Sequence, residues 1–121
     1  MRLIALRGAT TVEVNESAPI LEATGELMHE LLERNSLEAD DLVSCIFTLT
    51  EDLDAEFPAV AARGLGFGQV PLMCAREVPV PGSLPRVIRV MMHYHAADDH
   101  TARHVYLGEA KSLRRDLDSA Q

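Results

Sequence analysis

The chain has 121 residues, of which 47% are apolar and 25% charged, and its formal net charge is −8. This length and composition predict one globular domain and exclude a disordered or fibrous chain. The acidic balance argues against nucleic acid as a partner, and the apolar runs are too short for a membrane span or a secretory signal. We therefore expect a cytoplasmic protein that binds neither nucleic acid nor membrane.

The charges are unevenly distributed along the chain. Residues 1–56 carry thirteen acidic and three basic side chains, whereas residues 57–121 carry six acidic and eight basic ones. Ten of the eleven basic residues are arginine, whose planar fork suits the two oxygens of a carboxylate. Any anion site should draw on the second half of the chain, although a codon preference for arginine explains the composition equally well.

The first third of the chain predicts a strand followed by a long helix. Residues 3–8 have the apolar content of a short strand, and Thr10-Thr11 reads as a polar turn after it. Over residues 20–32, apolar side chains recur at helical spacing with glutamates on the opposite face, which predicts an amphipathic helix of about four turns. Ser17 is expected to be its N-cap, and the helix should end near Asn35.

The middle of the chain predicts two further strands separated by a short helix. Residues 36–41 form a capped helical turn, residues 42–50 a buried strand and residues 57–63 a short helix. The three glycines that follow this helix are not a dinucleotide fingerprint, because that motif must join a strand to a helix N-terminus. A third strand is expected over residues 69–74.

The strongest predicted strand covers residues 86–95, and a short one follows at residues 104–107. Alternation along the longer strand predicts a core face made of Ile88, Val90, Met92 and Tyr94. We expect one α+β domain over residues 1–115, with a mixed five-stranded sheet covered on one face by the long helix, and a tail over residues 116–121. The apolar side chains on the other face predict burial against neighbouring subunits.

Histidine and cysteine supply no metal or nucleophile signature. The pairs His93/His95 and His100/His104 lack a nearby acid or cysteine at zinc-type spacing, so we expect neither a metal nor a cofactor. The two cysteines show no CxxC spacing and are expected to be reduced. Cys74 is interpreted as a buried or pocket-lining residue rather than a nucleophile.

Arg89 stands out because it lies inside the apolar run of residues 87–92. An unpaired guanidinium would cost several kcal/mol if it were desolvated there. Arg89 must therefore face solvent, a counter-charge or an anionic ligand. Solvent exposure on a half-exposed sheet is the alternative to a site role.

Several segments, in order and with nearly invariant spacing, resemble the monofunctional AroH-class chorismate mutases. They are Arg7-Gly8-Ala9-Thr10-Thr11-Val12-Glu13, Phe57-Pro58-Ala59 with Arg63, Val70-Pro71, Cys74 with Glu77, Ile88-Arg89-Val90-Met91-Met92, Arg103-His104-Val105-Tyr106-Leu107 and Leu113-Arg114. The chain departs from the family pattern at Val60, Met73 and Arg115, where lysine, threonine and proline are usual. The resemblance implies a homotrimeric pseudo-α/β-barrel with active sites at the subunit interfaces. It also implies the conversion of chorismate to prephenate in phenylalanine and tyrosine biosynthesis.

The same resemblance implies a role for each matching residue. Arg89 would face the ether oxygen and the side-chain carboxylate of the substrate as the main electrostatic catalyst. Arg7 would hold that carboxylate, and Glu77 would accept a hydrogen bond from the ring hydroxyl and orient Arg89. The other implied substrate contacts are Tyr106 beside Arg7, Cys74 beside Glu77, the pocket walls Phe57, Met73 and Leu113, and the pocket mouth Arg63 and Arg114.

Two alternatives from other functional classes stay open on the sequence. A trimeric regulatory module could bind a dicarboxylate without converting it, which the departures at Val60 and Met73 would favour. A purely structural trimer with surface arginines would bind no carboxylate at all.

Overall fold

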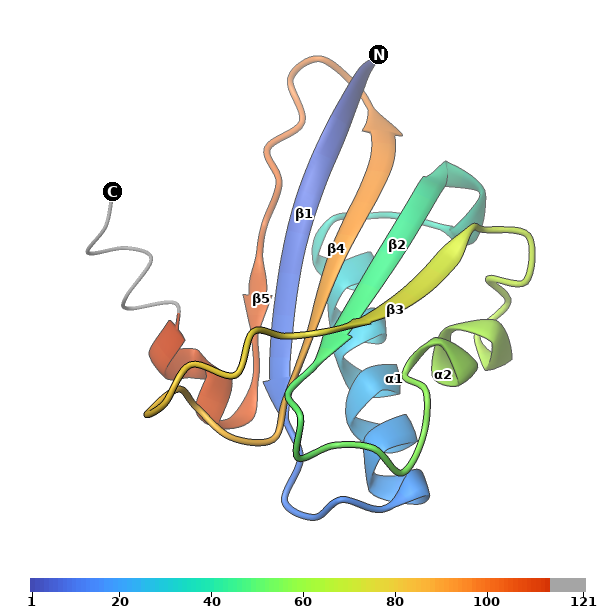
Figure 1. Cartoon of the computed structure of the whole chain (residues 1–121). Coiled ribbons are helices and arrows are strands. Elements are labelled where there is room, and N and C mark those ends of the chain that lie inside the picture. The colour runs from blue at the N-terminus through green and yellow to red at the C-terminus, as the bar shows by residue number, and fades with distance from the viewer. Residues whose placement is uncertain (114–121) are drawn as a thin grey trace.

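Five strands form one mixed sheet in the order β3-β2-β4-β1-β5, and both helices lie on one side of it (Figure 1). This computed structural model describes residues 1–113, so the expected boundary at residue 115, the tail and Arg114 lie outside the described residues. The elements are β1 Arg2–Thr11, α1 Ser17–Arg34, β2 Leu42–Leu49, α2 Ala59–Gly64, β3 Leu72–Arg76, β4 Val87–Ala96 and β5 Val105–Tyr106, with 3₁₀ turns at Ala39–Asp41 and Gly108–Ala110. Neither α1 nor α2 is long and apolar enough to cross a membrane.

Two kinds of strand pairing make the sheet mixed, as predicted. The central strand β4 pairs antiparallel with β1 and with β2. The edge strands β5 and β3 pair parallel with β1 and β2. The sheet therefore presents β3 at one edge and β5 at the other.

The helix-side face of the sheet is the core. The predicted core face of β4 is confirmed, since Ile88, Val90, Met92 and Tyr94 are all buried. Gly8 of β1 permits the close approach of α1, because a Cβ at this position would stand 2.8 Å from Cδ1 of Leu31. The apolar stripe of α1 therefore packs directly on β1 and β4.

The opposite face of the sheet, here called the open face, is covered by neither α1 nor α2 (Figure 1). Alternation places Leu3, Ile46 and Met73 on this face, and their exposed fractions are 60%, 38% and 63%. Large apolar side chains on a sheet face are typical of a surface that another subunit covers.

Three local predictions were wrong. β1 continues through Thr10 and Thr11, because they pair with Ile88 and Val87 of β4 instead of forming a turn. The N-cap of α1 is Glu16, and the hydroxyl of Ser17 donates instead to the carboxylate of Glu56 at 3.0 Å.

β3 is the third correction, since it covers Leu72–Arg76 rather than residues 69–74. A turn precedes it, in which the Val70 N–H donates to the Phe67 carbonyl. The strand begins where pairing with Cys45 of β2 begins. In all three places, hydrogen bonds to distant segments decided a boundary that local composition could not show.

Candidate active site

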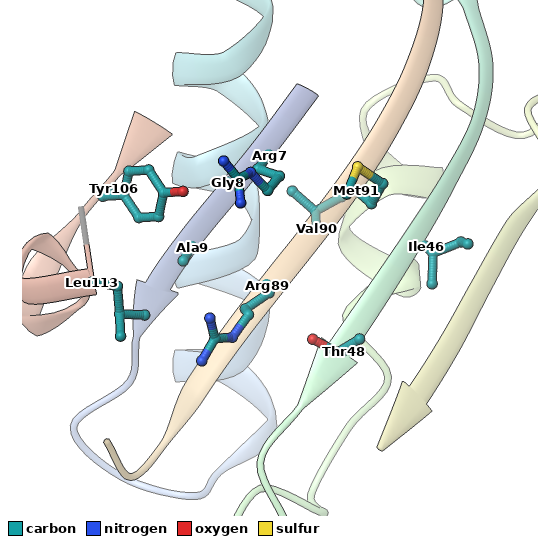
Figure 2. Close-up of a pocket in the computed structure, with 10 residues that line it drawn as sticks. All are labelled: Arg7, Gly8, Ala9, Ile46, Thr48, Arg89, Val90, Met91, Tyr106 and Leu113. Carbon is teal, nitrogen blue, oxygen red and sulfur yellow. The ribbon is translucent and has the colours of Figure 1, made fainter. Parts of the chain in front are cut away.

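A cavity of about 500 Å³ lies on the open face of the sheet, where β2, β4, β1 and β5 run side by side (Figure 2). Its lining includes Arg7, Ala9, Thr48, Arg89, Tyr106 and Leu113. Two guanidinium groups and a phenol thus stand in otherwise apolar surroundings, which suits an anion whose remaining surface is apolar.

Strand register brings these side chains together. Arg89 of β4 lies opposite Ala9 of β1 on one side and opposite Thr48 of β2 on the other. Ala9 also lies opposite Tyr106 of β5. The small side chain of Ala9 leaves the space between Arg89 and Tyr106 open, and in Figure 2 the Arg89 guanidinium points from β4 toward Leu113.

Arg89 has a counter-charge, which is one of the three surroundings that the sequence allowed. Its Nε donates to Oε2 of Glu77 at 3.0 Å, and the exposed fractions of the two side chains are 44% and 15%. The hydroxyl of Thr48 donates to the same Oε2 at 2.7 Å. Within residues 1–113, these bonds leave Oε1 of Glu77 and both terminal nitrogens of Arg89 unengaged.

Arg7 is anchored through its backbone. Its N–H donates to Nδ1 of His104 at 3.0 Å, a bond that requires this ring nitrogen to be unprotonated. Burial of the ring, with the nearby positive charge of Arg7, lowers the pKa of His104 below its usual value. Figure 2 shows the Tyr106 hydroxyl directed toward Arg7.

Four of the implied substrate contacts lie elsewhere on the chain. Phe57, Arg63, Met73 and Cys74 surround a second hollow of about 310 Å³ at the β3 edge. Phe57 is 65% exposed and Met73 is 63% exposed. The chain thus holds two separate groups of implied site residues, one on the open face between β2 and β5 and one at β3.

Thr48 and His104 are the residues of this site that sequence reasoning missed. Thr48 was recognised only as part of a β-branched strand, and His104 only as a weak metal candidate and as a member of a family-like segment, without a role of its own. Alternation along β2 could have placed Thr48 on the open face, but its neighbours Ala75 and Arg89 follow from pairing with distant strands. Among residues 1–113, no group of three His, Cys, Asp or Glu side chains is placed to hold a metal ion.

Both cysteines are free thiols, as predicted. Cys45 lies in the core, where burial raises its pKa to about 11. Cys74 is half-buried at the second hollow. Cys45 therefore stays a thiol at neutral pH and acts as a packing residue.

Comparison with known proteins agrees with this geometry. Residues 3–117 match the family model described as chorismate mutase type I. A protein named chorismate mutase AroH from Thermus thermophilus is 52% identical over 96% of this chain and 97% of its own length. The protein of the same name from Bacillus subtilis (strain 168) is 40% identical over 97% of this chain and 94% of its own length.

A solved structure is also closely similar. The chorismate mutase from Clostridium thermocellum superposes with a TM-score of 0.88 at 51% identity, over 91% of this chain and 99% of that one. A family match over almost the whole chain, two curated relatives and a shared fold agree with the arginine-lined cavity. The chain belongs to the chorismate mutase type I family.

Proposed function

We propose that the protein catalyses the [3,3] rearrangement of chorismate to prephenate, at sites that two protomers of a homotrimer build together. The observation that carries the proposal is the pair Arg7 and Arg89 facing one apolar cavity, with Arg89 already oriented by Glu77. Family membership and the AroH relatives support the activity.

The rearrangement needs positioning and charge stabilisation rather than acid–base groups. One C–O bond breaks as one C–C bond forms, with no proton transfer and no covalent intermediate. The protein must therefore hold the substrate folded and stabilise negative charge on the ether oxygen. The terminal nitrogens of Arg89 are suited to that oxygen and to the side-chain carboxylate, which Arg7 and Tyr106 hold from the other side. Oε1 of Glu77 is available to accept a hydrogen bond from the ring hydroxyl of the substrate.

The second group of residues fits the same site when it comes from a neighbouring protomer. Chorismate has two carboxylates, and Arg7 with Arg89 serve one of them, so the ring carboxylate needs a further cation. Arg63 and the exposed Phe57 and Met73 lie at the β3 edge, away from the Arg89 cavity of their own protomer. Docking this edge of one protomer onto the open face of the next covers the exposed apolar groups. It also makes a head-to-tail interface that closes into a ring of three.

A mixing experiment tests both the activity and the shared site. Chorismate consumption is measured for Arg89→Ala, for Arg63→Glu, and for an equimolar mixture refolded together. If the two variants assemble at random, about a quarter of the sites combine an intact Arg89 from one protomer with an intact Arg63 from its neighbour. The mixture should therefore regain about a quarter of the parent activity.

The outcomes of the mixing experiment separate the competing ideas. A site contained in one protomer would leave the mixture no more active than its two parents. Calorimetric binding of chorismate to the unaltered protein without prephenate formation would favour a dicarboxylate-binding regulatory module instead.

A further inference from the structure

Three hydrogen bonds hold Glu77 in place. Its backbone N–H donates to the Leu49 carbonyl at 3.0 Å, which ties the residue after β3 to the end of β2. Its side chain then reaches back over the open face, where Thr48 and Arg89 both donate to Oε2. The backbone bond fixes the position of the main chain at Glu77, and the side-chain bonds fix the position of its carboxylate.

Thr48 is placed to control this carboxylate. In the sheet it lies between Ala75 of β3 and Arg89 of β4, all three on the open face. The small Ala75 side chain leaves room for Glu77 to fold toward β2. Thr48 is β-branched and therefore stiff about χ1, so its hydroxyl is a donor at a fixed position.

From this geometry we infer that Thr48 is a positioning residue for Arg89, an inference that rests on the proposed function. A half-exposed ion pair alone orients its partners weakly, because the carboxylate can move between Nε and the terminal nitrogens of the guanidinium. The Thr48 hydroxyl, 2.7 Å from Oε2, holds that oxygen at Nε. Both terminal nitrogens of Arg89 then stay free for the ether oxygen and carboxylate of the substrate.

The hydroxyl is suited to this task because it carries no charge. A lysine or arginine at position 48 would fix Glu77 but would also compete with Arg89 for the substrate carboxylate. The other hydroxyl side chains of this strand region are engaged elsewhere, since Ser44 contacts Nδ1 of His93 and Thr50 donates to Asp52. Among residues 1–113, Thr48 is the one hydroxyl that reaches Glu77.

The test compares Thr48→Val and Thr48→Ser in the parent and in a Glu77→Ala background. Valine keeps the shape and strand preference of threonine while removing the donor. We expect it to lower kcat about tenfold, the low end for a hydrogen bond to a charged group. KM should change less than kcat, and serine should restore kcat to within about twofold of the parent. In the Glu77→Ala background, Thr48→Val should change kcat less than about twofold, because the carboxylate that the Thr48 hydroxyl contacts is already absent.

Ser44→Ala is the matched control, since it removes a hydroxyl from the same face of β2 without touching Glu77. Its kcat should equal that of the parent. A parent-like kcat for Thr48→Val would overturn the inference, and so would an equal loss in both backgrounds, which marks a general structural effect. Failure of the proposed function is distinguishable, because in that case the unaltered protein itself would form no prephenate from chorismate.

Discussion

Under the proposed function, Arg89 is the group on which catalysis most depends, and replacing it by alanine removes that group. Nε of Arg89 is engaged by Glu77, so the substitution takes away the two terminal nitrogens that face the cavity. Loss of one preorganised donor typically lowers kcat by about 10²–10³, which corresponds to about 2.7–4 kcal/mol of transition-state stabilisation. Without the arginine, the negative charge of the Glu77 carboxylate, whose side chain is 15% exposed, loses this counter-charge. Because this charge repels a dianionic substrate, we expect a loss of at least this size.

Arg34→Ala is the matched control for this substitution. Arg34 also pairs through Nε with a glutamate, Glu30, at 2.8 Å, and its side chain is 46% exposed against 44% for Arg89. It lies at the end of α1, on a helix rather than on the open face of the sheet. Deleting it should leave kcat unchanged, since an exposed helical ion pair contributes only about 0.3–0.5 kcal/mol to stability.

The assay follows the loss of chorismate absorbance at saturating substrate, with thermal unfolding and sedimentation showing that each variant is folded and assembled. A kcat for Arg89→Ala within about fivefold of the parent would refute the electrostatic role of this residue. An equal loss for Arg34→Ala would show that the assay reports damage to the fold.

Three further predictions concern stability and reactivity. Gly8→Ala should lower the free energy of unfolding by about 1–3 kcal/mol in urea titration, because the new Cβ meets Leu31 at 2.8 Å and Leu27 at 3.1 Å. Gly25→Ala, with no atom within 4 Å of its Cβ, should instead stabilise α1, and equal effects would contradict the close-approach argument. The pKa of His104 is lowered from 6.5 in the folded protein, so the unfolded chain binds a proton at this residue at a higher pH than the folded chain does. The stability that neutral His104 contributes is therefore complete above pH 6.5 and is lost as the pH falls through the folded pKa. His104→Asn keeps an acceptor for the Arg7 N–H without titrating, so the parent should lose stability relative to it below pH 6.5, and parallel pH curves would refute this. Cys45, with a pKa of about 11, should resist an alkylating reagent at pH 8 in the native protein, and rapid alkylation would show that its strand opens.

Much of the fold could be read from local patterns. The period of α1 and the alternation of β4 depend on which face of one element is apolar. The predicted core face of β4 is buried, and the buried side chains of α1 all lie within the predicted stripe of residues 20–32. The chemistry of Arg89 was accessible in part, because a guanidinium inside an apolar run must face solvent, a counter-charge or an anionic ligand wherever the strand lies in the fold.

Local patterns did not encode the pairing between distant segments, which the tertiary structure decided. Glu77 is twelve residues from Arg89 in the sequence and Thr48 is twenty-nine residues from Glu77, yet one carboxylate oxygen joins all three. The continuation of β1 through Thr11 and the separation of Phe57 from the Arg89 cavity have the same origin. Sheet order and register result from long-range hydrogen bonds and from the packing of α1 on Gly8, and no periodicity within a single strand encodes them.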